Sequence, residues 1–236
     1  MLFPQSLRRG RLIRRYERFL ADVIFDDALD EHQAETVHVA NPGAMSGLAE
    51  PGATVWCSLS PSKTRKLPYS WELVEARDGL VDVNTSRPNR LVGEALAAGV
   101  VPELAGYASV RSEVAYGVRS RVDFLLEAAA RPPCWVEVKG VTLSRRYGLV
   151  EWPDCVSTRG ARHLAELEAR VRLGERAVVL FVVQRSDCTR FGIASDLDPG
   201  FARATACALD AGVGALAYGC ELSLAGARLA RPLPFA

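Results

Sequence analysis

The sequence predicts an α/β chain of two domains: a small β-barrel over residues 1–83, then a three-layer α/β/α domain with a mixed sheet over residues 84–236. Two observations support this prediction. Short runs of alternating hydrophobicity, separated by turn residues, fill the first part. Strand-like and helix-like segments follow one another in the second part. With 236 residues and 49% hydrophobic content, the chain can bury one sizeable core or two modest ones.

The barrel prediction depends on the spacing of strands and turns. Strand-like runs occupy residues 12–25, 34–40, 54–59 and 70–75. The segments between them contain residue types that favour tight turns, in Asn41-Pro-Gly43, Pro51-Gly52 and Ser60-Pro-Ser62. Such spacing is typical of a small barrel or sandwich, and an OB barrel is one solution of this size.

The second part begins with a helix that Pro88 and Asn89 can open and Gly99 can end. After it we expect, in order, strands at 113–117, 122–127 and 135–141, a helix at 158–172, a strand at 177–184, a helix at 199–211 and a strand at 215–222. The run 177–183 is apolar on both faces, as a central strand covered by helices should be. The tail 222–236 is expected to be either disordered or a docking strand.

Three charged residues stand out in the expected strands of the second part. Asp123 lies in one strand, and Glu137 and Lys139 lie in the next. Because side chains alternate along a strand, Glu137 and Lys139 project from the same face. If the loop between the strands is centred near Ala130, the antiparallel register sets Asp123 opposite Glu137. Two carboxylates placed in this way can share a divalent ion.

This arrangement predicts a metal-dependent phosphodiesterase site. Asp123 and Glu137 are the expected ligands of Mg²⁺ or Mn²⁺, with the backbone carbonyl of Val138 as a third. Lys139 can orient or deprotonate the attacking water and offset phosphate charge, because burial can tune the pKa of an ammonium group. The alternative is structural: Lys139 would form a salt bridge with either carboxylate, and Glu-x-Lys is a common pattern by chance.

Other polar residues can extend the site, namely Glu113, Asp154, Arg159, His163 and Gln184. Each has a structural alternative. Glu113 would otherwise be an exposed strand acid, Asp154 a helix cap, and Gln184 a group that satisfies a strand end. Arg159 and His163 lie one helical turn apart and can reach a phosphate. A solvated helix face competes with that interpretation and is slightly favoured for His163.

A nucleic-acid surface must come from local charge segregation, because the net charge is only +1. Arginines crowd the start of the chain, at Arg8, Arg9, Arg11, Arg14, Arg15 and Arg18. An acidic stretch follows between Asp22 and Glu35. The arginines would bind phosphate, or they would protect a solvated edge strand by their charge; the pattern fits both.

Further cationic candidates for nucleic-acid contact are Arg65, Lys66, Arg87 and Arg90. The first two interleave with aromatic residues, which is the composition of a platform for single strands, although Trp56 and Trp71 fit core packing better. The last two flank the junction of the domains and would bridge them along one nucleic-acid path.

Cysteine usage and hydropathy predict a cytoplasmic protein. The six cysteines form no C-x-x-C pair and have no suitably spaced histidines, so a zinc site and a disulfide partner are both unexpected. The opening residues lack the apolar core of a signal peptide. No apolar run approaches the ~20 residues of a membrane span.

Several short motifs carry a resemblance to a known family. They are Arg14-Arg-Tyr-Glu-Arg-Phe-Leu-Ala-Asp-Val23, Asn41-Pro-Gly-Ala-Met45, Arg65-Lys-Leu-Pro-Tyr-Ser-Trp-Glu-Leu73, Val83-Asn-Thr-Ser-Arg-Pro-Asn-Arg90 and Trp152-Pro-Asp-Cys-Val-Ser-Thr-Arg-Gly160 with His163-Leu-Ala-Glu-Leu167. Their order and spacing resemble the sugar fermentation stimulation protein family, from the N-terminus to about Gly212. The pattern of Asp123 followed by Glu137-Val-Lys139 is similar to the motif of PD-(D/E)XK nucleases.

The resemblance implies a DNA-binding protein with an N-terminal OB-like barrel and a PD-(D/E)XK nuclease-like C-terminal domain. Two departures matter: the family usually carries Asn-Thr-Gly-Ser-Met where this chain has Asn41-Pro-Gly-Ala-Met45, and Phe-Pro-Asp where it has Trp152-Pro-Asp154. Two functions remain open, a Mg²⁺- or Mn²⁺-dependent nuclease and a non-cleaving DNA-binding regulator of sugar (maltose) metabolism genes. RNA or a nucleotide as substrate, strand preference and oligomeric state are open as well.

Overall fold

The computed structural model describes residues 1–30, 33–116 and 120–236. The first part is built from β1 (Arg8–Tyr16), β2 (Leu20–Phe25), β3 (Glu35–Val39), β4 (Thr54–Leu59), β5 (Tyr69–Ala76) and β6 (Gly79–Asp82). Neighbouring strands follow the order β3-β2-β1-β4-β5-β6, and a parallel pairing of β3 with β5 closes the barrel. Closure through β1–β4 and β3–β5 is the OB topology, so the predicted OB-like barrel is confirmed.

The barrel core comes from alternating strand residues, because every second side chain points inward. Leu12, Val23, Val37 and Trp71 are fully buried there. Alternating hydrophobicity predicted one run over residues 12–25, whereas the chain forms the separate strands β1 and β2. The turn between them contains residues with positive φ, which alternating hydrophobicity does not reveal.

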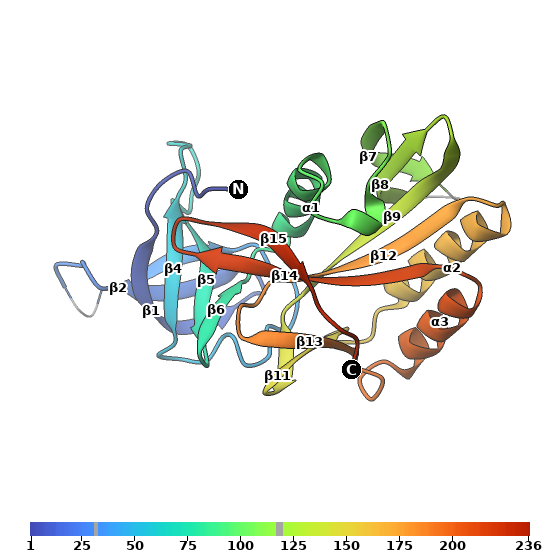
Figure 1. Ribbon diagram of the computed structural model, residues 1–236. Helices are drawn as coiled ribbons and strands as arrows, with labels where there is room; N and C mark the ends of the chain where they lie inside the picture. Colours follow the sequence, from blue (N-terminus) through green and yellow to red (C-terminus); the bar gives the residue numbers. More distant parts are fainter. Residues whose placement is uncertain (31–32, 117–119) are drawn as a thin grey trace.

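The second part is a three-layer α/β/α unit (Figure 1). Its main sheet has the order β15-β14-β12-β9-β8-β7, with β12 parallel to β9 and β14 and the other pairs antiparallel. The strands are β7 (Ser109–Tyr116), β8 (Ser120–Ala128), β9 (Arg131–Val141), β12 (Arg176–Val183), β14 (Gly214–Ser223) and β15 (Gly226–Pro232). The mixed sheet and its helical layers confirm the predicted class.

Helices cover both faces of this sheet. Leu164 of α2 (Thr158–Arg172) and Phe201 of α3 (Pro199–Asp210) pack on one face, whereas Leu91 of α1 (Arg87–Ala97) packs on the other. A short 3-10 turn, η1 (Pro102–Leu104), follows α1. β12 is buried along almost its whole length, as its apolar sequence predicted.

Side-chain caps set where two helices begin. The Ser157 hydroxyl accepts a hydrogen bond from the Gly160 amide at 3.1 Å at the start of α2, and Asp198 does the same for the Phe201 amide at 2.8 Å at the start of α3. Gly160 also lets α2 approach closely, since a Cβ there would stand 2.7 Å from the Trp152 ring. These caps place the face of α2 beside the end of β9.

Two further parts of the second domain are a small sheet that was not predicted and the tail, for which two alternatives were open. A smaller sheet, β10-β11-β13, consists of β10 (Leu143–Arg146), β11 (Gly148–Trp152) and β13 (Cys188–Ile193). The tail forms the edge strand β15 of the main sheet, and the Phe235 ring packs 5.1 Å from that of Phe191. Of the two expectations for the tail, disorder is therefore wrong and a docking strand is confirmed.

The two parts of the chain are packed directly together. The Asp82 amide donates to the carbonyl of Gln184 at 2.9 Å, and Val81 forms a bridge with Arg185. The Thr85 amide donates to the carbonyl of Ala40 at 3.0 Å, next to the 41–43 loop. In Figure 1 the β14–β15 hairpin reaches from the main sheet across to the barrel. The loop of the barrel at residues 41–43 is thereby held against the ends of β9 and β12.

Candidate functional site

The β8–β9 hairpin brings Asp123 and Glu137 side by side. In this antiparallel pair Phe124 lies opposite Val136, so the next position along places Asp123 opposite Glu137. The turn joins Ala128 to Arg131, around the centre that the sequence analysis assumed. The ladder agrees with the predicted register up to Phe124 and Val136, where it ends, and it contains a bulge between Leu126 and Ala128. The placement of Asp123 opposite Glu137 continues this register by one residue, at a point where the Val138 amide bonds to the Asp123 side chain.

Asp123 is held by two hydrogen bonds from different elements. Its Oδ1 accepts a hydrogen bond from the side-chain amide of Asn89 in α1, and its Oδ2 accepts one from the backbone N–H of Val138, each at 2.7 Å. Burial, followed by the charge of Glu137, raises the pKa of Asp123 above its ordinary value, although both hydrogen bonds oppose the rise. Lys139 already lies nearby as one positive charge, and a further positive charge beside Asp123 and Glu137 would favour the ionised form of Asp123.

Glu137 is almost completely buried, with 3% of its surface exposed. Its Oε1 accepts a hydrogen bond from the Lys139 ammonium at 2.7 Å and contacts His163 Nδ1. Burial acts to raise the pKa of Glu137, but the hydrogen bond from His163 and the charge of Lys139 outweigh it and lower the pKa. Among the described residues, its buried Oε2 has no hydrogen-bond partner.

Lys139, His163 and Arg159 form a chain of contacts along the face of α2. Lys139 Nζ lies 3.3 Å from His163 Nδ1, and the Arg159 Nε–H donates to His163 Nε2 at 3.3 Å. Because Nε2 accepts, the ring proton lies on Nδ1 and can be donated to Glu137. His163 is only 3% exposed, so the slightly favoured view of it as a solvated residue is wrong. The salt bridge offered as an alternative also forms, between Lys139 and Glu137.

Glu113 lies beside this group but points to solvent. The flanking pairs of β7 and β8, Ser112 with Phe124 and Val114 with Val122, put Glu113 level with Asp123. Glu113 is exposed and has a φ of 54°, a left-handed conformation that is uncommon for a residue other than glycine. Glu113 is therefore an exposed acid on a strand, as its structural alternative describes. Its proposed role as a further carboxylate of the metal site stays a prediction.

Asp154 and Gln184 line a small hollow between the barrel and the α/β domain. Its volume is about 200 Å³, and its walls come from the 41–43 loop, Thr85, the end of β9, β11 and the end of β12. Gln184 is 1% exposed, whereas Asp154 is partly exposed. Asp154 is not the cap of α2, since Ser157 takes that position. Trp152 also lines the hollow, and Lys139 Nζ lies 6.0 Å from the centre of its ring.

Sequence reasoning missed three polar residues around the carboxylates. Asn89 was read only as a helix opener, yet its amide positions Asp123. Tyr116 and Glu166 each have a buried oxygen without a hydrogen-bond partner among the described residues, as Glu137 does. Burial and the nearby charges of Glu137 and Glu166 raise the pKa of Tyr116. Alternating hydrophobicity gave no signal for any of them, because each is brought to the site by tertiary packing.

Comparisons with known proteins agree over both domains. The model of the sugar fermentation stimulation protein RE domain matches residues 86–226, and that of the SfsA N-terminal OB domain matches residues 13–83. The sugar fermentation stimulation protein homolog of Paramagnetospirillum magneticum is 54% identical over 233 residues, covering 99% of this chain and 97% of the relative. The chain belongs to the sugar fermentation stimulation protein family.

Two further relatives also match along almost the whole chain. The homolog from Caulobacter vibrioides is 51% identical, covering 98% of this chain and 95% of the relative. A solved structure titled "The structure of Pyrococcus Furiosus SfsA in complex with Ca2+" superposes with a TM-score of 0.87 at 26% identity, covering 100% of this chain and 98% of that one. The fold is thus shared along the whole chain with a distant member of the family.

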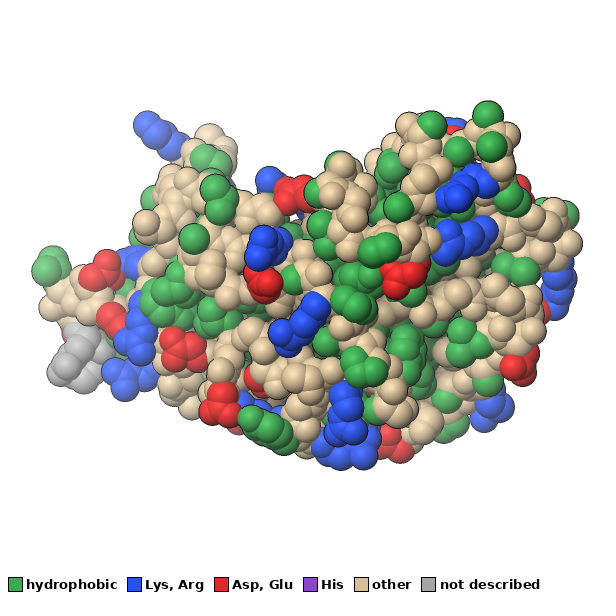
Figure 2. All heavy atoms as spheres, in the orientation of Figure 1, with side chains coloured by type: hydrophobic (Ala, Val, Ile, Leu, Met, Phe, Trp, Pro, Cys, Tyr) green, Lys and Arg blue, Asp and Glu red, His purple; other side chains and the backbone are tan. Residues whose placement is uncertain are grey.

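Most of the N-terminal arginines are already engaged within the barrel. Arg8 contacts Asp27 at 2.7 Å, Arg9 contacts Asp26 at 2.6 Å, and Arg14 contacts Asp22 at 2.8 Å, while the Arg15 guanidinium donates to backbone carbonyls that include those of Asn41 and Gly43. Arg11 and Arg18 are exposed. On the face drawn in Figure 2, blue and red side chains adjoin over the barrel and form no single positive patch. These contacts favour the charge-protected strand for Arg8, Arg9 and Arg14.

The prediction that Arg87 contacts nucleic acid is wrong. It is 6% exposed and ion-paired with Glu72 and Asp82, so its guanidinium cannot face a phosphate. The sequence could not show this, because the acids lie on β5 and β6. Arg90 is exposed and pairs with Glu94 at 3.2 Å.

The loop between β4 and β5 exposes Arg65 and Lys66. They remain available for contact with a phosphate backbone. Trp71 is fully buried in the barrel core, as the sequence analysis favoured. Trp56 is partly exposed, and the Arg9 guanidinium lies 5.9 Å from its ring.

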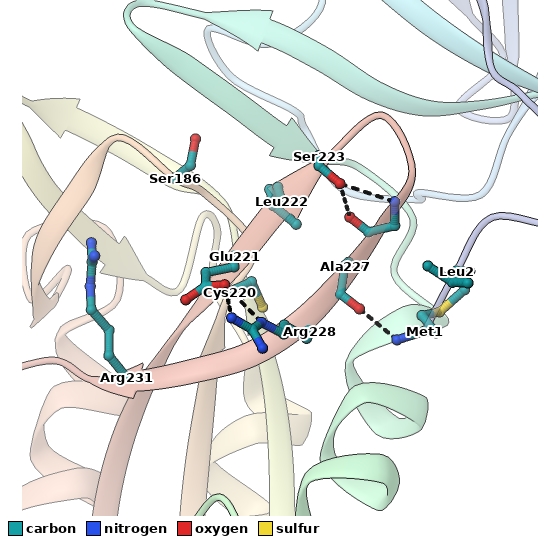
Figure 3. A pocket seen from close by; sticks show the side chains of 11 residues that line it. Met1, Leu2, Ser186, Cys220, Glu221, Leu222, Ser223, Ala227, Arg228 and Arg231 are labelled. Atoms are coloured by element: carbon teal, nitrogen blue, oxygen red, sulfur yellow. Dashed lines mark hydrogen bonds and ion pairs between the residues drawn. The ribbon is translucent and has the colours of Figure 1, made fainter.

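A roomier hollow of about 520 Å³ lies away from the carboxylates, along the β14–β15 hairpin (Figure 3). Met1 and Leu2 cover one side of it, and the Met1 ammonium donates to the carbonyl of Ala227 at 2.7 Å. Its acid, Glu221, is paired with Arg228 at 2.5 Å. Arg231 also lines the hollow, and Glu221 is the only carboxylate side chain among the described residues that line it, so the hollow lacks the pair of carboxylates found at Asp123 and Glu137.

The carboxylate pair fits a divalent cation in its chemistry. Asp123 and Glu137 supply hard oxygen atoms, and the buried Oε2 of Glu137 lacks a partner among the described residues. The described part of the chain contains no cluster of three or more histidine, cysteine, aspartate or glutamate residues around one point, so backbone carbonyls and water would have to complete the shell.

Within the described residues, no helix has the length and apolar character to span a membrane.

Proposed function

We propose that this chain is a DNA-binding protein with a Mg²⁺- or Mn²⁺-dependent phosphodiester-hydrolysing site in its α/β domain. The observation that carries the proposal is the opposed pair of Asp123 and Glu137, with the Lys139 ammonium on Glu137 Oε1 and the buried Oε2 unpartnered among the described residues. The Pyrococcus furiosus relative, described as a complex with Ca²⁺, supports it, since Ca²⁺ and Mg²⁺ both take oxygen ligands.

Asp123 and Glu137 would hold the cation, with the carbonyl of Val138 as a third ligand. A bound Mg²⁺ or Mn²⁺ would lower the pKa of a water molecule and offset charge on the phosphate. Asn89 and the Val138 amide fix the orientation of the Asp123 carboxylate. His163 does the same for Glu137, so both carboxylates are positioned before substrate arrives.

Lys139 acts on the water and on the phosphate. Its ammonium lies against the buried Glu137 and within 6.0 Å of the Trp152 ring, where it can orient the nucleophile and offset charge on the phosphate. Arg159, exposed at the start of α2, can bind an adjacent phosphate. The OB barrel, with Arg65 and Lys66 exposed, supplies a module of the kind that binds nucleic acid.

The test is calorimetric titration of Mn²⁺ and Mg²⁺ into the wild type and into Asp123→Asn/Glu137→Gln, with plasmid DNA incubated in parallel. We expect metal uptake and metal-dependent nicking by the wild type, and neither by the variant. Both substitutions keep side-chain shape but remove charge from a buried cluster, so thermal unfolding and circular dichroism are measured on the variant to show that it is folded under the assay conditions. Nicking that persists in the double variant would contradict the proposed site.

One observation favours a second function, a non-cleaving DNA-binding regulator of sugar (maltose) metabolism genes. Both oxygens of Asp123 and Oε1 of Glu137 already accept hydrogen bonds from the protein. A site satisfied in this way can be retained for structure alone. DNA binding by the wild type with no metal uptake and no nicking would support this function in place of the first.

A further inference from the structure

We propose that the hollow between the 41–43 loop of the barrel and the α/β domain binds one unpaired nucleobase, beside the phosphate that the carboxylate site acts on. This inference rests on the proposed function, because it assumes that a nucleic-acid chain reaches Lys139. It adds the substrate class, which is a single strand or an opened end of a duplex.

The hollow has the size of one ring. A volume of about 200 Å³ equals the space of roughly six water molecules, too little for two stacked bases. Both domains build it: Asn41, Pro42 and Gly43 from the barrel, and Gly140, Trp152 and the ends of β9 and β12 from the other. A site assembled in this way exists only when the barrel and the α/β domain are packed together.

Two glycines keep the hollow open. A Cβ at Gly43 would stand 2.9 Å from Asp154 Oδ2 and 3.0 Å from Asn41 Oδ1. A Cβ at Gly140 would stand 2.7 Å from Gln184 Oε1 and 2.9 Å from Pro88 Cγ. Added carbon at either position would thus take up space between the walls and crowd polar oxygens that now border it.

The polar walls suit a base better than a phosphate. The oxygens that border the hollow, from Asp154, Asn41 and Gln184, are acceptors, and Asp154 is an acid. A phosphate would be repelled by the Asp154 carboxylate, whereas the N–H groups at the edge of a base would be attracted to it. The Trp152 indole supplies an aromatic wall for a planar ring.

The hollow adjoins the reactive group. Lys139 Nζ lies 6.0 Å from the centre of the Trp152 ring, and Trp152 lines the hollow. A phosphate held at Lys139 would therefore have a neighbouring nucleoside at the mouth of the hollow. In a duplex that base is stacked and paired, so entry requires a single strand or a base that leaves the stack.

The first test uses metal-free protein and the deoxynucleosides of adenine, guanine, cytosine and thymine, with deoxyribose 5-phosphate for comparison. Calorimetry or ligand-observed NMR should detect binding of at least one nucleoside and none of the sugar phosphate. Gly43→Ala and Gly140→Ala, which narrow the hollow from opposite walls, should each weaken that binding at least tenfold. Gly93→Ala is the matched control, since its Cβ would meet only Phe124 at 3.6 Å, and should bind as the wild type does.

The second test compares cleavage of one labelled sequence as a single strand and as a duplex, with Mn²⁺. We expect the wild type to cut the single strand faster, Gly43→Ala to lose that preference, and the control Gly93→Ala to keep both the preference and the duplex activity. No nucleoside binding, together with equal cutting of both forms, would overturn the inference and leave the nuclease proposal intact. Nucleoside binding without any cleavage would uphold the hollow as a base site and contradict the nuclease proposal.

Discussion

The two parts of the molecule use charged residues in different ways. On the barrel, arginines of β1 face acids that follow closely in the chain, and most of these pairs lie at the surface: Arg9 and Asp26 are 49% and 41% exposed. In the α/β domain, the side chains of Lys139 and Glu137 are 12% and 4% exposed, and they meet His163 of α2. On the barrel, the ion pairs join residues that are close in the sequence. In the α/β domain, the charged residues form a buried cluster that comes from distant segments.

The difference teaches where charge has consequences. An exposed pair is screened by water and contributes about 0–1 kcal/mol to stability. A buried group that loses its partner leaves an uncompensated charge, which costs several kcal/mol, and its field acts on whatever enters the site. Charge density in the sequence is highest at the start of the chain, whereas chemistry is best supported at Asp123 and Glu137.

The largest expected effect comes from Lys139. Replacing it with alanine removes the ammonium that orients the nucleophile, so we expect the single-turnover rate of metal-dependent nicking to fall about 100-fold or more. Lys139→Arg should not restore the rate, because a guanidinium is larger and does not lose its proton. Arg146→Ala, at a side chain 72% exposed, is the control and should nick like the wild type.

An unchanged rate in Lys139→Ala would show that the buried cluster of the α/β domain is a salt bridge without a catalytic role. Rescue by Lys139→Arg would show instead that only the positive charge matters. Either outcome would weaken the distinction between the surface ion pairs of the barrel and the buried cluster of the α/β domain.

A smaller effect is expected on stability, at the ion cluster that joins the domains. Arg87→Met leaves Glu72 and Asp82 buried without their cation, so we expect unfolding in urea to become easier by ~3–5 kcal/mol. Arg9→Ala, at the barrel surface, should cost ~0–1 kcal/mol. The combination Glu72→Gln/Asp82→Asn/Arg87→Met should recover much of the loss, because no buried charge remains. Equal costs for Arg87→Met and Arg9→Ala would contradict the distinction.

The sequence predicted what local pattern determines. The approximate register of β8 and β9 followed from the alternation of side chains and the length of the turn, although the bulge between Leu126 and Ala128 did not. The start of α3 followed from Asp198 with Pro199. The apolar run of β12 identified a central strand because both its faces are covered. These features depend on neighbours within a few residues.

The rest depends on contacts between distant segments. Arg87 resembled a surface cation until β5 and β6 placed acids around it, and His163 resembled a solvated residue until Glu137 met it from β9. The tail had no clear strand pattern, yet pairing with β14 makes it an edge strand. The hollow between the domains needed the 41–43 loop to meet β9 and β12, which no single segment encodes.

The smallest effect is expected at Asp198, whose charge is neither an exposed pair nor a buried cluster. Its carboxylate accepts hydrogen bonds from the amides of Ser157 and Phe201, each at 2.8 Å, and these lower its pKa below the ordinary 3.8. A carboxylate with a lowered folded-state pKa stabilises the fold above its unfolded pKa and loses that contribution as the pH falls through the folded value. We expect Asp198→Ala to cost ~1 kcal/mol at pH 7. Asp198→Asn still caps the helix but carries no charge. The difference in free energy of unfolding between this variant and the wild type, measured in urea, should therefore shrink as the pH is lowered from 6 to 3.

A difference between the two free energies of unfolding that grows on acidification would show that the negative charge of Asp198 destabilises the starts of the helices. It would also show that burial, more than hydrogen bonding to the backbone, determines the effect of charges in this domain.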